Sequence, residues 1–235
     1  MYLSVIIPSY NEEERIASTL QKIESFLEGK GFDYEILVVD DGSSDKTKKI
    51  ALESNLAQKG RLGVLANEKN MGKGYSVKRG VREAIGEYIL FTDADLSTPI
   101  DEIEKLLHGI ECGADIAVGS RSINTSNVVM RQPLYRQTMG KVFNLLVRMF
   151  LGENFKDTQC GFKLFKQDAA KSLFGNLTTD GFAFDAELLF LARKRGYKVR
   201  EIGVKWKNSP SSTVHPVSSS LRMLWDIFKI RRIHR

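Results

Sequence analysis

The sequence predicts an α/β fold in which a mainly parallel central sheet carries helices on both faces. Short apolar runs alternate along the chain with segments whose apolar residues recur at helical spacing, as in successive strand–helix units. The run EILVV at 35–39 is continuously apolar after its first residue, which is typical of a parallel strand buried on both faces. The chain has 235 residues, 42% of them hydrophobic, which is enough for one large domain of this kind.

The alternation is regular up to residue 120 and changes beyond it. We expect strands at 3–8, 34–40, 61–66, 88–92 and 115–120, with helices between them at 12–28, 44–57, 74–84 and 100–111. Farther on we expect a mobile polar loop at 122–135, helices at 133–151, 185–195 and 217–235, a strand or loop at 157–165, a strand at 198–206 and a Ser/Pro loop at 208–216. The prediction is therefore one domain at 1–206, followed at 207–235 by a loop and an amphipathic basic helix.

Composition excludes several classes of protein. No run of about 18 uncharged apolar residues is present, so no transmembrane helix is expected. The apolar stretch that ends at Pro8 is short and follows no basic segment, so it is expected to be a buried strand and not a signal peptide. Cys112 and Cys160 form no CxxC pair, which argues against zinc and suits a reducing cytosol. The net charge of +6 fits an anionic substrate or membrane surface, and no basic run with interleaved aromatic residues indicates nucleic acid.

Acidic and polar residues follow three of the expected strands. PSYNE at 8–12 closes the first, Asp40-Asp41-Gly42-Ser43 the second, and Asp93-Ala94-Asp95 the fourth. Ligands of open parallel sheets bind beyond the carboxyl ends of the strands. Any one of these acids could serve only as a helix cap, contributing about 0.3–1 kcal/mol. Three acidic ends at one edge favour a binding site.

The pair Asp93 and Asp95 predicts a divalent metal site. Neighbouring carboxylates repel each other, and Mg²⁺ prefers a few carboxylates together with phosphate oxygens. Such a metal would neutralise charge on a departing diphosphate. A dinucleotide site would need GxGxxG after the first strand, and no glycine stands there. Gly72-Lys73-Gly74 follows the third strand, either as a loop that requires glycine torsions or as a segment that places Lys73 near a nucleotide.

Taken together, these motifs resemble family 2 glycosyltransferases, whose catalytic domain has the Rossmann-like GT-A fold. The matching segments, in the family's order, are VIIPSYNEE, EILVVDDGSSDKT, NMGKGYSVKRGV, YILFTDADLSTP and ADIAVGSR. Two later segments, DTQCGFKLF and FAFDAELLFLARKRGY, resemble the branch of polyprenyl-phosphate sugar synthases. The resemblance extends over about residues 3–206.

The resemblance implies a nucleotide-sugar donor, Mg²⁺ or Mn²⁺, and a polyprenyl-phosphate acceptor. It implies that the metal is held by Asp93 and Asp95. The implied donor-binding positions are Pro8, Tyr10, Glu12, Val39, Asp40, Lys73, Asp93, Ala94, Asp95 and Arg121. The implied phosphate or acceptor contacts are Arg131, Arg136 and Lys207, arginine being suited to phosphate by its bidentate geometry. Arg131 and Arg136 would equally suit a solvated helix start.

Two departures from the family pattern refine the expectation. Mannose-transferring members usually read DADLQHP where this chain reads DADLSTP, and Ser97 together with DTQCGFK resembles the glucose-transferring branch. UDP-glucose is therefore expected over GDP-mannose. The family's lysine-bearing glycine-rich loop after the last strand is replaced by NSPSSTVHP. Lys207 or His215 would have to substitute there, although a lone histidine is more often a surface residue.

The implied acceptor simplifies the chemistry. A phosphate monoester has a second pKa of about 6, so it is largely dianionic at pH 7 and is already a nucleophile. Direct displacement would invert an α-linked donor to a β-linked product without a strong general base. Asp185, the second candidate catalytic residue with Asp95, and Glu187 lie at a predicted helix start. They would orient acceptor or metal, or act only as helix-start acids.

Two questions stay open on the sequence alone. The helix at 217–235 carries Leu221, Leu224, Trp225 and Phe228 near one face and basic residues at its end, which suits a peripheral position at the cytoplasmic membrane face. It would equally suit packing on the domain or in an oligomer. Transfer to a sugar hydroxyl, with Asp185 as base, is one alternative function. A non-catalytic or nucleotidyl-transferring protein is another, although PSYNEE is not the glycine-rich basic loop that the latter needs.

Overall fold

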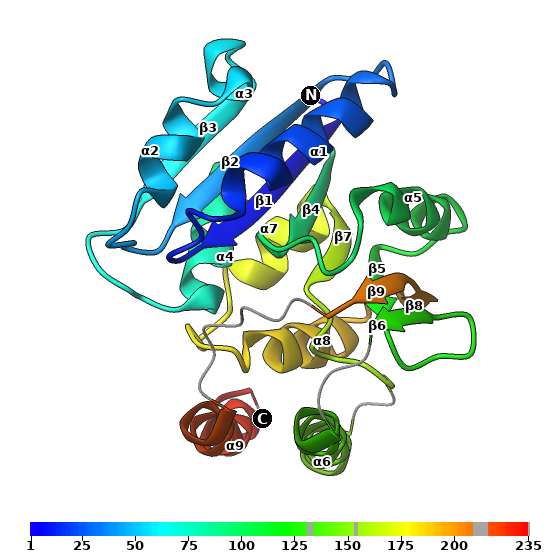
Figure 1. Ribbon diagram of the computed structural model, residues 1–235. Helices are drawn as coiled ribbons and strands as arrows, with labels where there is room; N and C mark the ends of the chain where they lie inside the picture. Colours follow the sequence, from blue (N-terminus) through cyan, green and yellow to red (C-terminus); the bar gives the residue numbers. More distant parts are fainter. Residues whose placement is uncertain (131–133, 153–154, 209–215, 235) are drawn as a thin grey trace.

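The computed structural model describes residues 1–130, 134–152, 155–208 and 216–234. Its centre is a seven-stranded sheet in the order β3-β2-β1-β4-β7-β5-β8 (Figure 1). The strands are β1 Leu3–Ser9, β2 Tyr34–Asp40, β3 Leu62–Ala66, β4 Tyr88–Thr92, β5 Ile116–Ser120, β7 Phe162–Lys166 and β8 Val199–Gly203. Strand β7 runs antiparallel to both of its neighbours, and the other pairings are parallel. The predicted mainly parallel α/β fold is confirmed.

Helices cover both faces of this sheet. In chain order, the described helices of the protein are α1 Ile16–Glu28, α2 Thr47–Leu52, α3 Asn55–Gln58, α4 Lys73–Glu83, η1 Ile100–Glu102, α5 Ile103–Glu111, α6 Leu134–Leu151, α7 Gln167–Phe174, α8 Phe184–Lys194 and α9 Pro216–Ile233. Helices α1, α2, α3 and α5 pack into one hydrophobic cluster, and α4, α7 and α8 into a second. Along β1, Val5 and Ile7 enter the first cluster and Ile6 the second. This two-sided burial explains why the strands are continuously apolar.

Three elements differ locally from the prediction. The helix predicted at 44–57 is two helices, because Ser54 caps α3 by accepting a hydrogen bond from the Ala57 amide. Helix α7 was not predicted, although Ala169, Ala170, Leu173 and Phe174 bury one face of it. The strand predicted at 198–206 divides at Gly203 into β8 and β9 Lys205–Lys207, which belong to different sheets.

The prediction of a loop throughout 122–135 is wrong within its described part. Residues Asn127–Met130 form β6, which pairs in parallel with β9 as a two-stranded sheet. Three of its four residues are exposed, so the apolar alternation that would reveal a strand is weak. The pairing partner lies far along the chain, which is information that local sequence does not hold.

The last helix packs on the domain by one face. Helices α6 and α9 lie side by side beyond α8, at the end of the molecule farthest from β3 (Figure 1). Phe143 and Val147 of α6 form a third cluster with Ala183 and Ala186 near α8 and with Ile227 and Ile230 of α9. A boundary at residue 206 remains a prediction. In the described part of the chain, no helix is both long and apolar enough to cross a membrane.

Candidate active site

The carboxyl ends of β1, β2 and β4 meet at one edge of the sheet. Strand β1 pairs in parallel with β2 on one side and with β4 on the other. The segments that follow these strands therefore leave the sheet together, as the sequence predicted. Two backbone positions there are strained, since Asn11 and Leu96 have φ values of 53° and 46°. Non-glycine residues with positive φ are uncommon and gather at functional sites.

Asp40 and Asp41, at the end of β2, have different surroundings. Asp40 is buried, and its Oδ1 atom has no hydrogen-bond partner within the protein. Asp41 accepts hydrogen bonds at Oδ1 from the Met71 amide and at Oδ2 from the Gly72 amide, both at 2.9 Å. A buried acceptor without a partner costs free energy unless a ligand supplies a donor. Asp40 can thus accept from a ligand, whereas Asp41 fixes the loop that leads to Lys73.

The remaining donor-side positions lie in β1 and β2 or directly after β1. Pro8 lies in β1 beside Val39 of β2, and the Val39 side chain packs in the core against α4. Tyr10 is 37% exposed at the rim. The Glu12 carboxylate pairs with Arg15. Burial raises the pKa of Glu12, and the charges of Asp95 and Asp93 add to this effect against the opposing influence of Arg15.

The Asp93-Ala94-Asp95 segment is held on several sides. Thr19 of α1 donates a hydrogen bond to the Ala94 carbonyl at 2.6 Å. Asp95 accepts at Oδ1 from the Ser97 amide and at Oδ2 from the Ser97 hydroxyl, both at 2.9 Å. Burial and the neighbouring charge of Asp93 raise the pKa of Asp95, and the hydrogen bonds from Ser97 offset this only partly. Ser97, the position that distinguished two branches of the family, thus orients the second carboxylate.

Lys73 lies against the first carboxylate. Its Nζ atom is 2.7 Å from Asp93 Oδ1. Burial disfavours the ammonium, but the charges of Asp93 and Asp185 outweigh burial and raise the pKa of Lys73. Gly161 borders the same carboxylate so closely that a Cβ atom there would lie 2.0 Å from Asp93 Oδ2. The glycine of DTQCGFK therefore makes room for Asp93.

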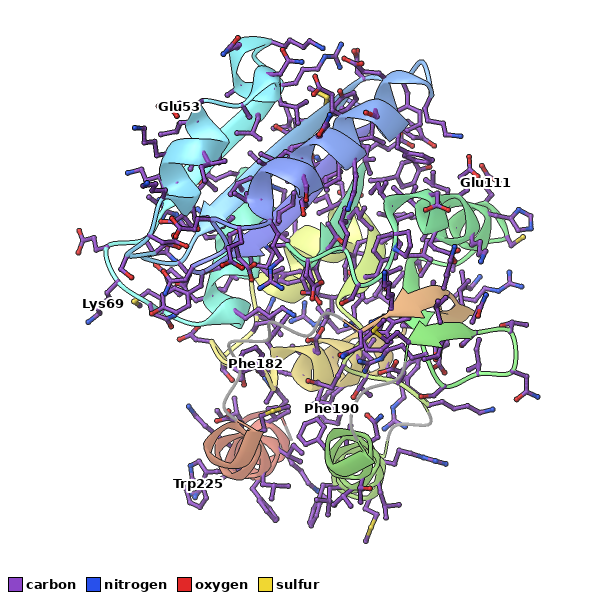
Figure 2. The ribbon with its side chains drawn as sticks, viewed as in Figure 1. Glu53, Lys69, Glu111, Phe182, Phe190 and Trp225 are labelled. Carbon is purple, nitrogen blue, oxygen red and sulfur yellow. The ribbon has the colours of Figure 1, made fainter. Side chains whose placement is uncertain are left out.

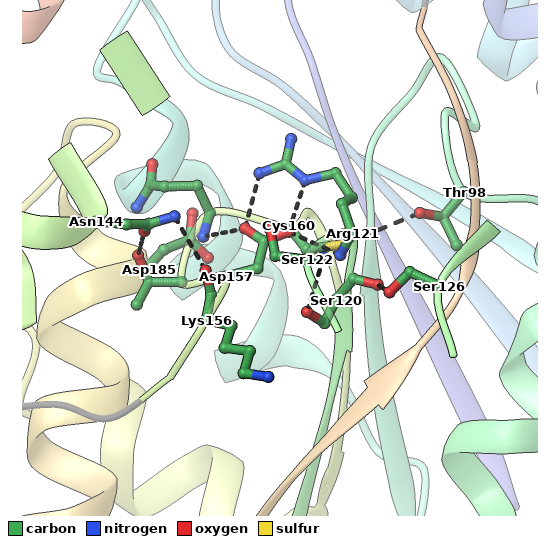
Figure 3. Close-up of polar contacts among 12 residues, drawn as sticks. Thr98, Ser120, Arg121, Ser122, Ser126, Asn144, Lys156, Asp157, Cys160 and Asp185 are labelled. Carbon is green, nitrogen blue, oxygen red and sulfur yellow. Dashed lines mark hydrogen bonds and ion pairs between the residues drawn. The ribbon is translucent and has the colours of Figure 1, made fainter. Parts of the chain in front are cut away.

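Arg121 forms a bidentate ion pair with Asp157 (Figure 3). Its Nε atom lies 2.6 Å from Oδ2 and its Nη2 atom 2.8 Å from Oδ1 of that fully buried carboxylate. Burial alone would raise the pKa of Asp157, but the adjacent guanidinium holds it below its usual range. A predicted phosphate contact of Arg121 would thus use the edge of the guanidinium that Asp157 leaves free. In the sequence between Asp157 and Gly161, the buried Nε2 atom of Gln159 has no hydrogen-bond partner within the protein.

Asp185 is buried beneath the site and forms an ion pair with Lys163. The same ammonium donates to the Cys160 carbonyl at 2.6 Å. Burial raises the pKa of Asp185, while Lys163 and Lys73 act in the opposite direction. Neither oxygen is presented to solvent, since the side chain is 3% exposed. Its predicted catalytic role remains a prediction, and this environment suits a residue that positions others.

The phosphate and acceptor residues predicted on the C-terminal half are less completely described. Arg131 and His215 lie outside the described residues, and so does the side chain of Arg136. Lys207 ends β9 with an exposed side chain, and its amide donates to the Ser97 carbonyl at 2.8 Å. That hydrogen bond brings the end of β9 to the loop that carries Asp95.

The residues at this edge fit a divalent cation that is completed by a ligand. Among the described residues, no three His, Cys, Asp or Glu side chains are grouped so as to hold a metal ion by themselves. Asp93 and Asp95 instead supply two neighbouring carboxylates, and burial together with the charge of Asp93 raises the pKa of Asp95. Mg²⁺ commonly takes one or two protein carboxylates and fills its other positions with phosphate oxygens and water.

Four residues of this site were not among the predicted positions. They are Asp41, Asp157, Gly161 and Lys163. Asp157 and Gly161 stand in the quoted motif DTQCGFK, so their presence was visible but their partners were not. Lys163 is the last residue of the same motif, but its burial was not predictable, because a lysine in an alternating strand pattern ordinarily predicts an exposed position.

Comparison with known proteins agrees with this geometry. The sequence profile of Glycosyl transferase family 2 matches residues 4–174. A dolichyl-phosphate beta-glucosyltransferase of Dictyostelium discoideum is 38% identical over 98% of this chain and 74% of its own length. The proteins of that name from Homo sapiens and Saccharomyces cerevisiae are each 36% identical, over 97% and 98% of this chain and 74% of their own lengths.

Solved structures share the fold at low sequence identity. Glucosyl-3-phosphoglycerate synthase of Mycobacterium tuberculosis, in complex with Mn²⁺, UDP-glucose and glycerol 3-phosphate, aligns with a TM-score of 0.73 at 18% identity, over 98% of this chain and 79% of that one. Mannosyl-3-phosphoglycerate synthase of Rubrobacter xylanophilus aligns with a TM-score of 0.70 at 19% identity, over 100% of this chain and 74% of that one. Both likenesses confirm the expected GT-A architecture. The chain is a glycosyltransferase and belongs to Glycosyl transferase family 2.

Proposed function

We propose that this protein transfers glucose from UDP-glucose to the phosphate of a polyprenyl lipid, with inversion at the anomeric carbon. The observation that carries the proposal is the near full-length similarity to proteins named dolichyl-phosphate beta-glucosyltransferase in three distant organisms. The donor side of the site supports it independently. The unpaired Oδ1 of Asp40 suits the N–H donor of a uracil ring.

The proposed metal site is Asp93 with Asp95, occupied by Mn²⁺ or Mg²⁺ together with the donor. When bound, the cation would neutralise the charge that develops on the leaving diphosphate. The role of the protein is to orient these two carboxylates. Ser97 holds Asp95, while Gly161 and Lys73 hold Asp93. The unpaired Gln159 amide is available to a hydroxyl or phosphate oxygen of the donor.

A lipid phosphate suits the acceptor side better than a sugar hydroxyl does. A hydroxyl acceptor needs a general base within reach of its proton. Asp185, the predicted base, is buried and ion-paired with Lys163. A phosphate dianion needs no such base, because it is already nucleophilic at neutral pH. Transfer to a sugar hydroxyl is accordingly the second candidate, and the state of Asp185 argues against it.

The acceptor would be reached through the outer faces of α6 and α9. Met149 and Trp225 are 66% and 73% exposed, although the two helices pack together through Phe150 and Phe228. Figure 2 shows Trp225 pointing away from the domain, whereas Phe190 points from α8 towards the two helices. Exposed basic side chains accompany this apolar face, namely Arg148, Lys229, Arg231 and Arg232. We name the outer faces of α6 and α9 the apolar–basic face, and its charge complements an anionic bilayer surface.

Calorimetry with nucleotide sugars tests the donor assignment. With Mn²⁺ present, we expect UDP-glucose to bind and GDP-mannose to bind at least about tenfold more weakly, because a pocket that fits a uracil ring would not accommodate the larger guanine. Omitting Mn²⁺ should weaken UDP-glucose binding. Tight GDP-mannose binding without UDP-glucose binding would refute the assignment.

Vesicle sedimentation tests the proposed peripheral position at the cytoplasmic membrane face. The double substitution of Met149 and Trp225 by serine should reduce association with phosphatidylserine vesicles and leave UDP-glucose binding unchanged, because both side chains are exposed and neither is a proposed donor contact. Association of the wild-type protein should also weaken with salt, since each basic residue near an anionic surface contributes about 1 kcal/mol. The matched control replaces Leu52 and Ile85, which are 52% and 61% exposed on other surfaces. Equal loss in both double variants would contradict a specific membrane face.

A further inference from the structure

We infer that Glu187 is a positioning residue of the donor site. It fixes residues 177–181 against the start of α4 and thereby holds Lys73 at Asp93. The inference rests on the proposed function only in that the ligand is a metal-bound nucleoside diphosphate sugar. Glu187 itself contacts neither Lys73 nor Asp93, so it would act through the backbone between them.

Glu187 is a fully buried carboxylate with a complete set of hydrogen bonds. Its Oε1 atom accepts from the Thr178 amide at 2.9 Å and from the Thr178 hydroxyl at 2.7 Å. Its Oε2 atom accepts from the Thr179 amide at 2.8 Å. Burial alone would raise the pKa of Glu187, but the hydrogen bonds from His234, Thr178 and Thr179 outweigh burial and hold it below its ordinary value. The carboxylate thus fastens two consecutive residues of the 177–181 segment to α8.

On the side away from Glu187, the same segment packs against α4. The Tyr75 amide donates to the Asp180 carbonyl at 3.1 Å, and Lys78 Nζ donates to the Leu177 carbonyl at 2.8 Å. A Cβ atom on Gly72 would lie 2.5 Å from the Asp180 carbonyl oxygen, and one on Gly74 would lie 2.7 Å from the Thr179 carbonyl oxygen. Such distances leave room only for glycine. The 177–181 segment is therefore tightly packed between α8 and α4.

Lys73 stands between those two glycines, so the 177–181 segment sets where its backbone lies. Gly72 has a φ of 106°, a conformation that favours glycine. From this position Lys73 reaches Asp93 at 2.7 Å. Close approach of 177–181 thus requires the glycines of Gly72-Lys73-Gly74 and places the lysine beside Asp93, while a contact of Lys73 with a nucleotide stays a prediction. If the Glu187 carboxylate is lost, the segment can move and Lys73 with it.

Helix α9 supplies a further hydrogen bond to the same carboxylate. His234 Nε2 lies 2.6 Å from Glu187 Oε1, and Lys194 of α8 donates to the His234 carbonyl. His234 directly follows α9, whose outer side is part of the apolar–basic face. The buried Glu187 carboxylate therefore helps to position both α9 and Lys73.

A double-mutant cycle between Glu187 and Lys73 tests this inference. UDP-glucose binding in the presence of Mn²⁺ is measured by calorimetry for the wild-type protein, Glu187→Gln, Lys73→Met and the double variant. We expect Glu187→Gln to weaken binding about tenfold, since a glutamine cannot accept all of these hydrogen bonds. In the Lys73→Met background the same change should weaken binding less than about twofold, because the group through which it acts is already gone.

The control is Glu35→Gln. Glu35 also clamps a distant loop, accepting from the Ile85 amide at 2.8 Å and from the Ser4 hydroxyl at 2.5 Å, but at the opposite edge of the sheet. The Glu35→Gln substitution should lower the melting temperature without changing the affinity for UDP-glucose. If Glu187→Gln fails to fold, Thr178→Val removes one of the hydrogen bonds and should show the same non-additivity on a smaller scale.

The outcomes separate this inference from the proposed function. Full additivity in the cycle, or unchanged binding by a folded Glu187→Gln protein, overturns the role of Glu187 while wild-type binding still supports the donor assignment. A wild-type protein that binds no UDP-sugar overturns both.

Discussion

Asp95→Asn is expected to abolish glycosyl transfer and to leave the fold intact. The asparagine can keep both interactions with Ser97, because its oxygen accepts from the amide and its nitrogen donates to the hydroxyl. What it loses is the negative charge beside Asp93, and with it a proposed ligand of the cation. Removing a group that stabilises charge in the transition state costs about 3–4 kcal/mol, so kcat should fall by at least about two to three orders of magnitude.

The thermal stability of the Asp95→Asn protein should not fall with its activity. The pKa of Asp95 is raised in the folded protein, so its charged form at neutral pH is disfavoured by folding. That cost is absent below the unfolded pKa and is fully present above the folded one. The variant should therefore melt at the wild-type temperature or slightly higher at pH 7. Asp101→Asn, at an exposed position in η1, serves as the control. Near-wild-type turnover of Asp95→Asn at saturating Mn²⁺ would contradict the proposed metal site.

Gly161→Ala is expected to have the next largest effect. The added methyl group would lie 2.0 Å from Oδ2 and 2.6 Å from Oδ1 of Asp93. Since the carboxylate is the end of a short side chain, it can rotate away, and the protein should still fold. Rotation removes it from Lys73 and from the proposed metal position. A displacement of about 1 Å can cost about 100-fold in rate, so kcat/KM should fall by about that factor.

The matched control for this change is Gly29→Ala. A methyl group at Gly29 would meet its nearest atom, the Phe26 carbonyl oxygen, at an ordinary 3.6 Å. Both proteins are compared by thermal melting, by UDP-glucose binding with Mn²⁺ and by turnover. A Gly161→Ala protein that binds and turns over normally would show that Asp93 need not occupy the position seen here.

The sequence predicted the sheet, and the meeting of three strand ends at one edge of it, because each signal was local. Continuous apolar runs predicted β1, β2 and β4, and the acids that follow each run mark the edge at which we propose that the donor binds. Strand β6 was missed because its four residues are mostly exposed and its partner β9 is distant in sequence. Helix α7 was missed because nothing was predicted between the segment at 157–165 and the helix at 185–195, although Ala169, Ala170, Leu173 and Phe174 bury one helical face.

Within the site, residue types were predictable but pairings were not. The phosphate contact predicted for Arg121 rests on a motif, and nothing local indicated that Asp157 takes one side of its guanidinium. Asp185 is predicted as a catalytic residue that orients acceptor or metal or serves as the base for a hydroxyl acceptor, or else only as a helix-start acid. The structure adds Lys163, a fully buried lysine that arrives from the antiparallel strand β7. Such pairings depend on tertiary packing, which no single stretch of sequence records.

The most direct test of the account is to identify the product. Purified protein is incubated with UDP-glucose labelled in the sugar, Mn²⁺ and dolichyl phosphate, with GDP-mannose and an oligosaccharide acceptor in parallel reactions. We predict an organic-soluble, acid-labile β-linked glucosyl phosphate lipid, formed from UDP-glucose only and lost when EDTA removes the metal. Transfer of label to the oligosaccharide, with none to the lipid phosphate, would contradict the proposed acceptor and the mechanism that needs no general base.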